Sequence, residues 1–186
     1  LVIKESRLDA LTHFYVARDS MYRQVYQHRV IQTIDTIACN IIKRVKFLSA
    51  ECRSEDEYRK RFEQLAIFAD ADLIKALMTN SLEDNLPISS IYTMNESWWN
   101  YHLMRWQNCN DQILKDLSAR IIERKLFKNL RFEESSKVEM INKLQAICRD
   151  KNLDPEYYLS VIDTKDKHRK KSDLIPLVLL DSGEIK

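Results

Sequence analysis

The sequence is nearly without glycine. Gly183 is the single glycine among 186 residues, and only three prolines interrupt the chain. Loops that hold phosphate groups, of the P-loop or dinucleotide-binding kind, need several glycines because their backbone approaches the phosphate at unusual φ angles. The composition therefore excludes those two kinds of nucleotide site. Because tight turns are scarce, it also favours long helices.

Metal frameworks, disulfide frameworks and catalytic motifs are also missing. The four cysteines stand far apart, without a CxxC pair or a nearby histidine, which is typical of reduced thiols in an intracellular protein. The four histidines form neither an HExxH motif nor a His-Cys cluster. No Ser or Cys lies in a nucleophile elbow. We find no complete catalytic constellation and predict no metal ligand within this chain.

Charge of one sign does not dominate. Thirty basic and twenty-eight acidic residues leave a formal net charge of +2, so no overall polycation is available to hold nucleic acid. The basic run KDKHRKK, residues 165–171, is interpreted as a solvated loop, with a nucleic-acid patch as the weaker alternative. No apolar run approaches the length of a membrane span, and we expect no signal peptide. We therefore predict an intracellular protein of the cytoplasm or nucleus, not bound to membranes.

Apolar residues at three- and four-residue steps predict most of the fold as helix. The pattern runs from residue 6 to about 48, with a break expected at Asp19-Ser20, where either residue can cap a new helix. Ser54 and Glu57 form a capping box that opens the next helix, which the pattern extends to residue 77. The remaining pattern predicts an irregular segment over 79–97 and then an aromatic helix at 98–106, whose tryptophans suit a core or an interface. It predicts a further helix after Asn110, and another that is capped by Ser135 and ends near 152–153.

Strand signals are confined to three short stretches. Residues 126–132 alternate between apolar and polar, residues 157–163 are rich in β-formers, and residues 174–180 form a short apolar run. The predicted fold class is therefore mainly α (α+β), helical with a small late β-sheet. The predicted domains are a helical part, residues 1–132, and a small C-terminal α/β subdomain, residues 133–186.

The stretch MYRQVYQHR, residues 21–29, is unusually rich in rings and hydrogen-bonding groups. At about 100° per residue, Arg18, Tyr22 and Arg29 share one helix face, with Tyr26 beside it. Arginine offers fork-shaped donors to phosphate oxygens, and tyrosine offers a flat face and a hydroxyl. Gln27 can donate and accept at a base edge. This combination suits a ligand that carries phosphates and a ring or sugar, while an ordinary exposed surface explains the same composition equally well.

The same residues resemble a known family. ARDSMYRQVYQHRVIQTIDTI, residues 17–37, resembles the helix after the metal site in HD-domain phosphohydrolases. It is most similar to the SAM-and-HD-domain deoxynucleoside triphosphate triphosphohydrolases, through YQHR followed by TIDTI. FADADLIKAL at 68–77 and IIERKLFK at 121–128 resemble further segments of that family. The resemblance implies an enzyme that cleaves a dNTP to a deoxynucleoside and triphosphate.

The resemblance also implies roles for particular residues. Arg18 would contact the substrate phosphates, Tyr26 would stack on the deoxyribose, and Gln27 would face the base. A regulatory nucleotide, whose binding drives tetramer assembly in the family, would be held by Lys4, His28, Arg29 and Lys115. Arg18 and Gln27 point in opposite directions in one straight helix, because they are nine residues apart at about 100° each. The pocket hypothesis therefore requires a break in the helix near Asp19-Ser20.

The metal motif of the family is absent, since no His-Asp dipeptide occurs in the sequence. In the family these ligands lie N-terminal to the YQHR helix. We therefore expect residues 1–186 to be the C-terminal part of a longer, homo-oligomeric enzyme (a dimer or tetramer), in which the missing part binds a divalent metal (Mg, Mn, Fe or Zn). This chain alone is predicted to be inactive. Two alternatives remain: an HD phosphohydrolase that acts on another nucleotide or phosphoester, and a catalytically inactive HD-derived interaction or nucleic-acid-binding module.

Overall fold

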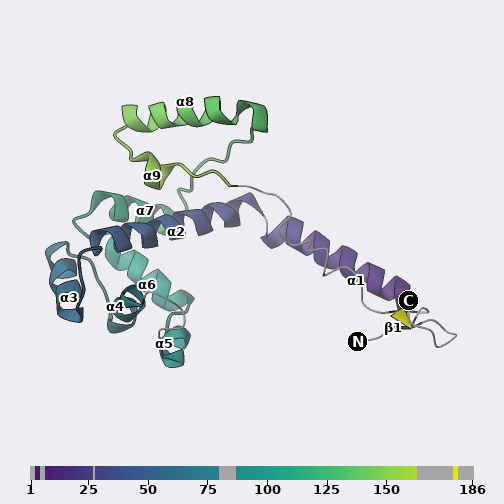
Figure 1. The fold of residues 1–186 in the computed structure, drawn as a ribbon, viewed down its shortest axis with the longest axis horizontal. Helices are drawn as coiled ribbons and strands as arrows, with labels where there is room; N and C mark the ends of the chain where they lie inside the picture. The colour runs from purple at the N-terminus through teal and green to yellow at the C-terminus, as the bar shows by residue number, and fades with distance from the viewer. Residues whose placement is uncertain (1–2, 5–6, 27, 80–86, 163–177, 180–186) are drawn as a thin grey trace. The chain divides into compact units, whose positions relative to one another are not determined.

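A computed structural model of the chain describes residues 3–4, 7–26, 28–79, 87–162 and 178–179 (Figure 1). The described residues fall into two compact units, one drawn from residues 1–31 and 161–186 and the other from residues 32–160. Most of them are helical, so the prediction of a mainly α fold is confirmed. The predicted division into domains 1–132 and 133–186 stays a prediction. Within the described ranges, no helix has both the length and the apolar character that a membrane span requires.

The first unit is built on α1 (Leu8–Met21), which continues directly into one turn of π-helix, η2 (Tyr22–Tyr26). Helix α2 (Arg29–Leu48) begins in this unit and continues into the second. The predicted helix break at Asp19-Ser20 is wrong, because both residues lie inside α1. The Tyr22 N–H bonds to the carbonyls of Arg18 and Asp19, so no orphan donor needs a cap there. The chain instead leaves α geometry a few residues later, at the wider π turn.

The strand predictions are mostly wrong. Residues 126–132 are irregular, and Leu126 and Phe127, although adjacent in sequence, both pack against the core, which the alternating faces of a strand do not allow. Tyr157 and Tyr158 lie in a short helix that Asp154 caps, and the stretch from 159 to 162 forms no strand. Within 174–180 the structure describes only β2 (Val178–Leu179), which pairs in parallel with β1 (Ile3–Lys4). Asp163 and the rest of 174–180 lie outside the described residues.

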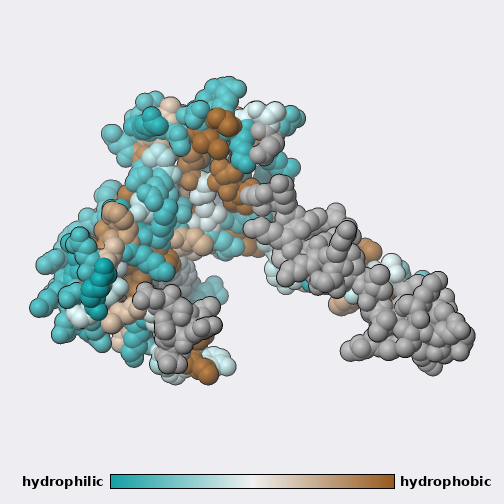
Figure 2. Space-filling view, viewed as in Figure 1, coloured by the Kyte–Doolittle hydropathy of each residue, from teal (hydrophilic) through white to brown (hydrophobic). Residues whose placement is uncertain are grey.

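The second unit continues from α2 through a series of shorter helices. They are α3 (Glu55–Gln64), α4 (Ala71–Met78), α5 (Ile88–Thr93), α6 (Glu96–Trp106), α7 (Gln112–Ile122), the 3₁₀ turn η3 (Glu134–Ser136), α8 (Lys137–Asp150) and α9 (Pro155–Tyr158). The apolar stripe of α2, with Ile37, Ile41 and Val45 fully buried, lies in one core with residues of α3, α4, α6 and α7. Trp106 is completely buried, and the other two tryptophans pack against the same core, as expected. The side of α3 seen in Figure 2 is hydrophilic, while its Tyr58 and Phe62 are buried.

Capping residues fix most helix starts in this unit. Ser54 accepts a hydrogen bond from the Glu57 N–H, as predicted, while the Glu57 carboxylate accepts from the Arg53 N–H. The predicted continuation of this helix to residue 77 is wrong. The chain turns at Ala66, whose φ is 52°, and Asp70 caps a separate α4 through the Leu73 N–H at 2.8 Å.

Two further boundaries differ from expectation. Residues 88–93, predicted to be irregular, form α5, because the hydroxyls of Ser90 and Thr93 donate to Asp72 of α4 at 2.7 and 2.8 Å and hold the short helix in place. Residues 80–86 lie outside the described part of the chain. Ser135 is not the cap of α8, since it lies within the 3₁₀ turn that precedes that helix.

Candidate functional site

The first unit carries a hollow along α1 and η2. Its volume is about 250 Å³, and it is lined by Phe14, Ala17, Arg18, Met21, Tyr22 and Tyr26. Arg18 and Tyr26, to which the resemblance gives roles in substrate binding, therefore face the same space. The break near Asp19-Ser20 that the hypothesis called for is absent, and a π turn follows these residues at Tyr22–Tyr26. Whether Gln27 joins Arg18 at this hollow stays a prediction. Single π turns inserted in helices are frequent at functional sites.

Arg18, Tyr22 and Tyr26 form a continuous stack along this hollow. The Arg18 guanidinium lies over the Tyr22 ring at 4.8 Å from its centroid, and the Tyr22 and Tyr26 ring centroids are 5.2 Å apart. A guanidinium over an aromatic face is attracted by the ring quadrupole and keeps its N–H edges pointing outward. Within the described ranges, no hydrogen bond or ion pair engages the Arg18 guanidinium. The stack therefore presents a cation held by a ring and, at its end, Tyr26, a residue that is 55% exposed.

Tyr22 is given no role by the resemblance, although its spacing places it on the same helix face as Arg18. The structure puts it between the two assigned residues, where it supports both. The signal was in the spacing, since Phe14, Arg18, Tyr22 and Tyr26 follow one another at four-residue steps. A search for ring and guanidinium pairs at i,i+4 would have found it.

The other assigned residues are not gathered at this hollow. Gln27 lies outside the described residues. His28 directly precedes α2, and its Nδ1 accepts a hydrogen bond from the Val30 N–H at 3.3 Å, so this imidazole acts as the N-cap of α2. Arg29 is the first residue of α2 and is exposed.

The two lysines assigned to the regulatory nucleotide belong to different units. Lys4 lies in β1, where its backbone pairs with Leu179 of β2. Lys115 lies exposed on α7 of the second unit. Neither lines the hollow on α1 and η2.

Among the described residues of the second unit, the ion pair with the least exposed side chains joins Arg44 and Asp111, and it stabilises the fold. The Arg44 guanidinium of α2 forks onto the Asp111 carboxylate, with Nε–Oδ1 at 3.1 Å and Nη2–Oδ2 at 2.7 Å. Burial alone would raise the pKa of the Asp111 carboxyl, but the hydrogen bonds from Arg44 and from the Leu114 N–H outweigh it, and this pKa lies below its ordinary value. The hydrogen bond to Asp111 raises the pKa of Arg44 above its ordinary value. The pair fastens α2 to the start of α7.

The part of the chain that the structure describes contains no group of three or more His, Cys, Asp or Glu side chains that could hold a metal ion. The residues that line the hollow are a cation, rings and apolar side chains. This set can bind and orient a ligand that has an anionic end and a flat or apolar part.

Comparison with known proteins identifies the fold. No family model matches the chain. The uncharacterized protein YwfO of Bacillus subtilis (strain 168) is 28% identical over 193 residues, which span 100% of this chain and 41% of YwfO. The crystal structure of a phosphohydrolase from Bacteroides thetaiotaomicron VPI-5482 matches with a TM-score of 0.70 at 21% identity, over 100% of this chain and 45% of that one. The chain has the fold of part of a phosphohydrolase. It spans less than half the length of each of these two proteins.

Proposed function

We propose that the chain is the C-terminal part of a metal-dependent dNTP triphosphohydrolase of the HD-domain type. The observation that carries the proposal is the stack of Arg18, Tyr22 and Tyr26 around one hollow. Arg18 and Tyr26 are the residues that the YQHR resemblance assigns to substrate. The fold shared with part of a phosphohydrolase supports the same class of reaction.

In this proposal the chain binds and orients the substrate. Arg18 offers its N–H edges to phosphate oxygens, and its stacking on Tyr22 limits the side-chain freedom that is lost on binding. Tyr26 presents its ring to the deoxyribose, where a 2′-hydroxyl would be excluded, and Gln27 reads the base. A divalent metal, Mg, Mn, Fe or Zn, would be held by residues outside this chain, and the chemistry that it would supply when bound is activation of a water and polarisation of a phosphoryl oxygen. The 186-residue chain alone then hydrolyses no dNTP.

Regulation and assembly form a second layer of the proposal. His28 and Arg29, with Lys4 and Lys115, would contact a regulatory nucleotide that promotes a homo-oligomer, a dimer or tetramer. The Nδ1 of His28 already accepts the hydrogen bond that caps α2, so Nε2 is the atom that would contact the nucleotide.

The test is dNTP hydrolysis by a longer protein that contains this chain, in Mg²⁺ or Mn²⁺, with released inorganic triphosphate as the readout. Arg18→Ala is expected to lower kcat/KM by about 10²–10³-fold, since it removes a charged donor from the developing phosphate charge. Tyr26→Ala is expected to lose activity, while Tyr26→Phe keeps the ring and most of the rate. Lys60→Ala, an exposed cation on α3, is the matched control and leaves the rate unchanged.

Three results would contradict the proposal. One is that a folded, metal-loaded parent protein releases no triphosphate from any dNTP. Another is that Arg18→Ala matches Lys60→Ala in rate. The third is dNTP hydrolysis by the isolated chain under clean conditions. Release of orthophosphate from a different phosphoester would point to the broader phosphohydrolase alternative, and nucleotide binding without turnover would point to an inactive module.

A further inference from the structure

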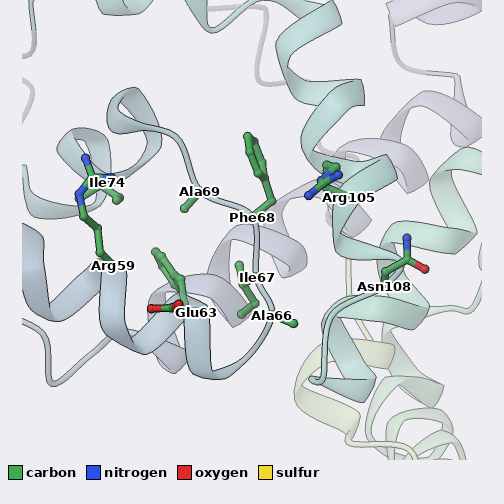
Figure 3. A pocket seen from close by; sticks show the side chains of 10 residues that line it. Arg59, Glu63, Ala66, Ile67, Phe68, Ala69, Ile74, Arg105 and Asn108 are labelled. Carbon is green, nitrogen blue, oxygen red and sulfur yellow. The ribbon is translucent and has the colours of Figure 1, made fainter.

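A second concave site lies wholly within the second unit. A groove of about 570 Å³ runs between α3 and the C-terminal end of α6 and is floored by the connection from α3 to α4 (Figure 3). Phe62, Ile67 and Ile74, each at most 5% exposed, supply its apolar side. The volume falls within the range of about 300–1,000 Å³ that is usual for small-molecule sites.

The connection that floors the groove is held in place by hydrogen bonds from two residues that do not line it, Trp106 and Asn110. The chain turns at Ala66 with a φ of 52°, and the Asn110 N–H donates to the Leu65 carbonyl at 2.8 Å. Further along, the indole N–H of buried Trp106 donates to the Phe68 carbonyl at 2.7 Å. Because the connection is fastened at both ends, the groove exists before any ligand arrives, and binding need not order it.

Opposite charges stand on the two walls of the groove. Arg105 lies on the α6 wall, with its guanidinium stacked 5.3 Å from the centroid of the Phe68 ring, and Glu63 lies on the α3 wall. Across the described ranges neither side chain makes an ion pair, with the other or with a third residue. Arg59, which also lines the groove, is by contrast paired with Glu55 one turn away. The groove therefore offers a ligand one cation, Arg105, and one anion, Glu63, above an apolar floor, and neither is in an ion pair with a described residue.

We propose that this groove binds a small zwitterion with an apolar body, of the chemical class of an α-amino acid with an apolar side chain. The carboxylate of the ligand would lie on Arg105, beside the Asn108 amide, in the forked geometry that guanidinium groups favour. The ammonium group would lie on Glu63, and the side chain would cover Ile67. A simple anion would be attracted by Arg105 but repelled by the Glu63 carboxylate. A simple cation would be attracted by Glu63 but repelled by Arg105. The site is independent of the hollow on α1 and η2.

Three ligands of one shape separate these possibilities. L-phenylalanine carries both charges, 3-phenylpropionate lacks the ammonium group, and phenethylamine lacks the carboxylate. We expect isothermal titration of the protein that contains this chain to give a dissociation constant of about 0.1–1 mM for phenylalanine, as suits a small ligand in an open groove. The two single-charge analogues should bind about tenfold more weakly or not at all.

Variants of the two walls should act in opposite senses. Glu63→Gln is expected to weaken phenylalanine about tenfold and to leave 3-phenylpropionate unchanged or tighter, because the repulsion is gone. Arg105→Gln should weaken phenylalanine and spare phenethylamine. Lys60→Gln, which neutralises an exposed α3 charge that does not line the groove, should change nothing, and circular dichroism shows whether each variant folds. Equal binding of all three ligands, binding of none, or indifference to Glu63→Gln in a folded protein would overturn the proposal.

Discussion

Substitutions at Asp111 can separate two roles of its carboxylate, which pairs with Arg44 and caps α7. Its two oxygens take the fork of hydrogen bonds from Arg44, and Oδ1 also caps α7 by accepting from the Leu114 N–H at 2.8 Å. Only 10% of the Asp111 side chain and 15% of the Arg44 side chain are exposed. Loss of the carboxylate therefore leaves a helix start without its cap and a largely buried guanidinium without its ionic partner, although the guanidinium still lies over the rings of Phe47 and Tyr157.

The expected magnitudes differ between two substitutions. Asp111→Ala loses the cap, which costs about 1 kcal/mol. It also leaves Arg44 unpaired, which costs about 3 kcal/mol, at the low end of the range for buried pairs because solvent still reaches the guanidinium. Asp111→Asn keeps a side-chain oxygen for the cap, so we expect its free energy of unfolding to fall by about 2–3 kcal/mol. Combining Asp111→Asn with Arg44→Met should recover about 1–2 kcal/mol of that loss, as the interaction energy of the pair.

Urea unfolding followed by tryptophan fluorescence measures these differences, since Trp98, Trp99 and Trp106 all lie in the second unit with the pair. The dependence of the free energy on urea concentration should be the same in every variant, because the surface exposed on unfolding does not change. Equal losses for Asp111→Asn and Asp111→Ala would refute the separate contribution of the cap, and a loss under about 0.5 kcal/mol for Asp111→Asn would refute the argument that the charge pair holds α2 to α7.

Three further predictions concern the same unit. The folded-state pKa of Asp111 lies below 3.8, so its contribution to stability should be complete above about pH 5 and be lost as the pH falls through 3.8 to that lower value. When the free energy of unfolding is measured against pH, Asp111→Asn should therefore lose less stability on acidification than the unchanged chain does. Ala66→Gly should stabilise the chain by about 0.5–1 kcal/mol in urea unfolding, since it relieves a residue at φ 52°. Trp106→Phe should cost about 2 kcal/mol in the same assay, because the Phe68 carbonyl loses its donor.

The sequence was sufficient where local chemistry decides the structure. Ser54, with its polar side chain three residues before Glu57, fixes the start of α3, and the apolar steps of α2 and α7 identify the faces that the structure buries. The alternation of apolar and polar residues at 126–132 predicted a strand wrongly, because this local pattern does not report whether another strand lies beside it to pair with. Leu126 and Phe127 are held by the core of a helical unit, and no second strand lies beside them among the described residues.

The candidate site was predicted in its residues but not in its geometry. Arg18 and Tyr26 could be named from the YQHR stretch, and whether they bind substrate stays a prediction. The π turn at Tyr22–Tyr26 has no sequence signature that we know, because its residues fit an α-helix equally well. The groove beside Arg105 was missed altogether, since its walls come from segments about forty residues apart, and no pattern within either segment reports the other.

The cap of α2 restricts what His28 can recognise. Its Nδ1 accepts the Val30 N–H, so the neutral ring carries its proton on Nε2 and offers a ligand one donor and no acceptor. A ligand group that instead required an acceptor at Nε2 would move the proton to Nδ1, against the Val30 N–H, and would unfasten the first turn of α2. Phosphate and carbonyl oxygens therefore fit this ring, whereas amino groups do not, and the choice of tautomer ties ligand chemistry to the start of a helix.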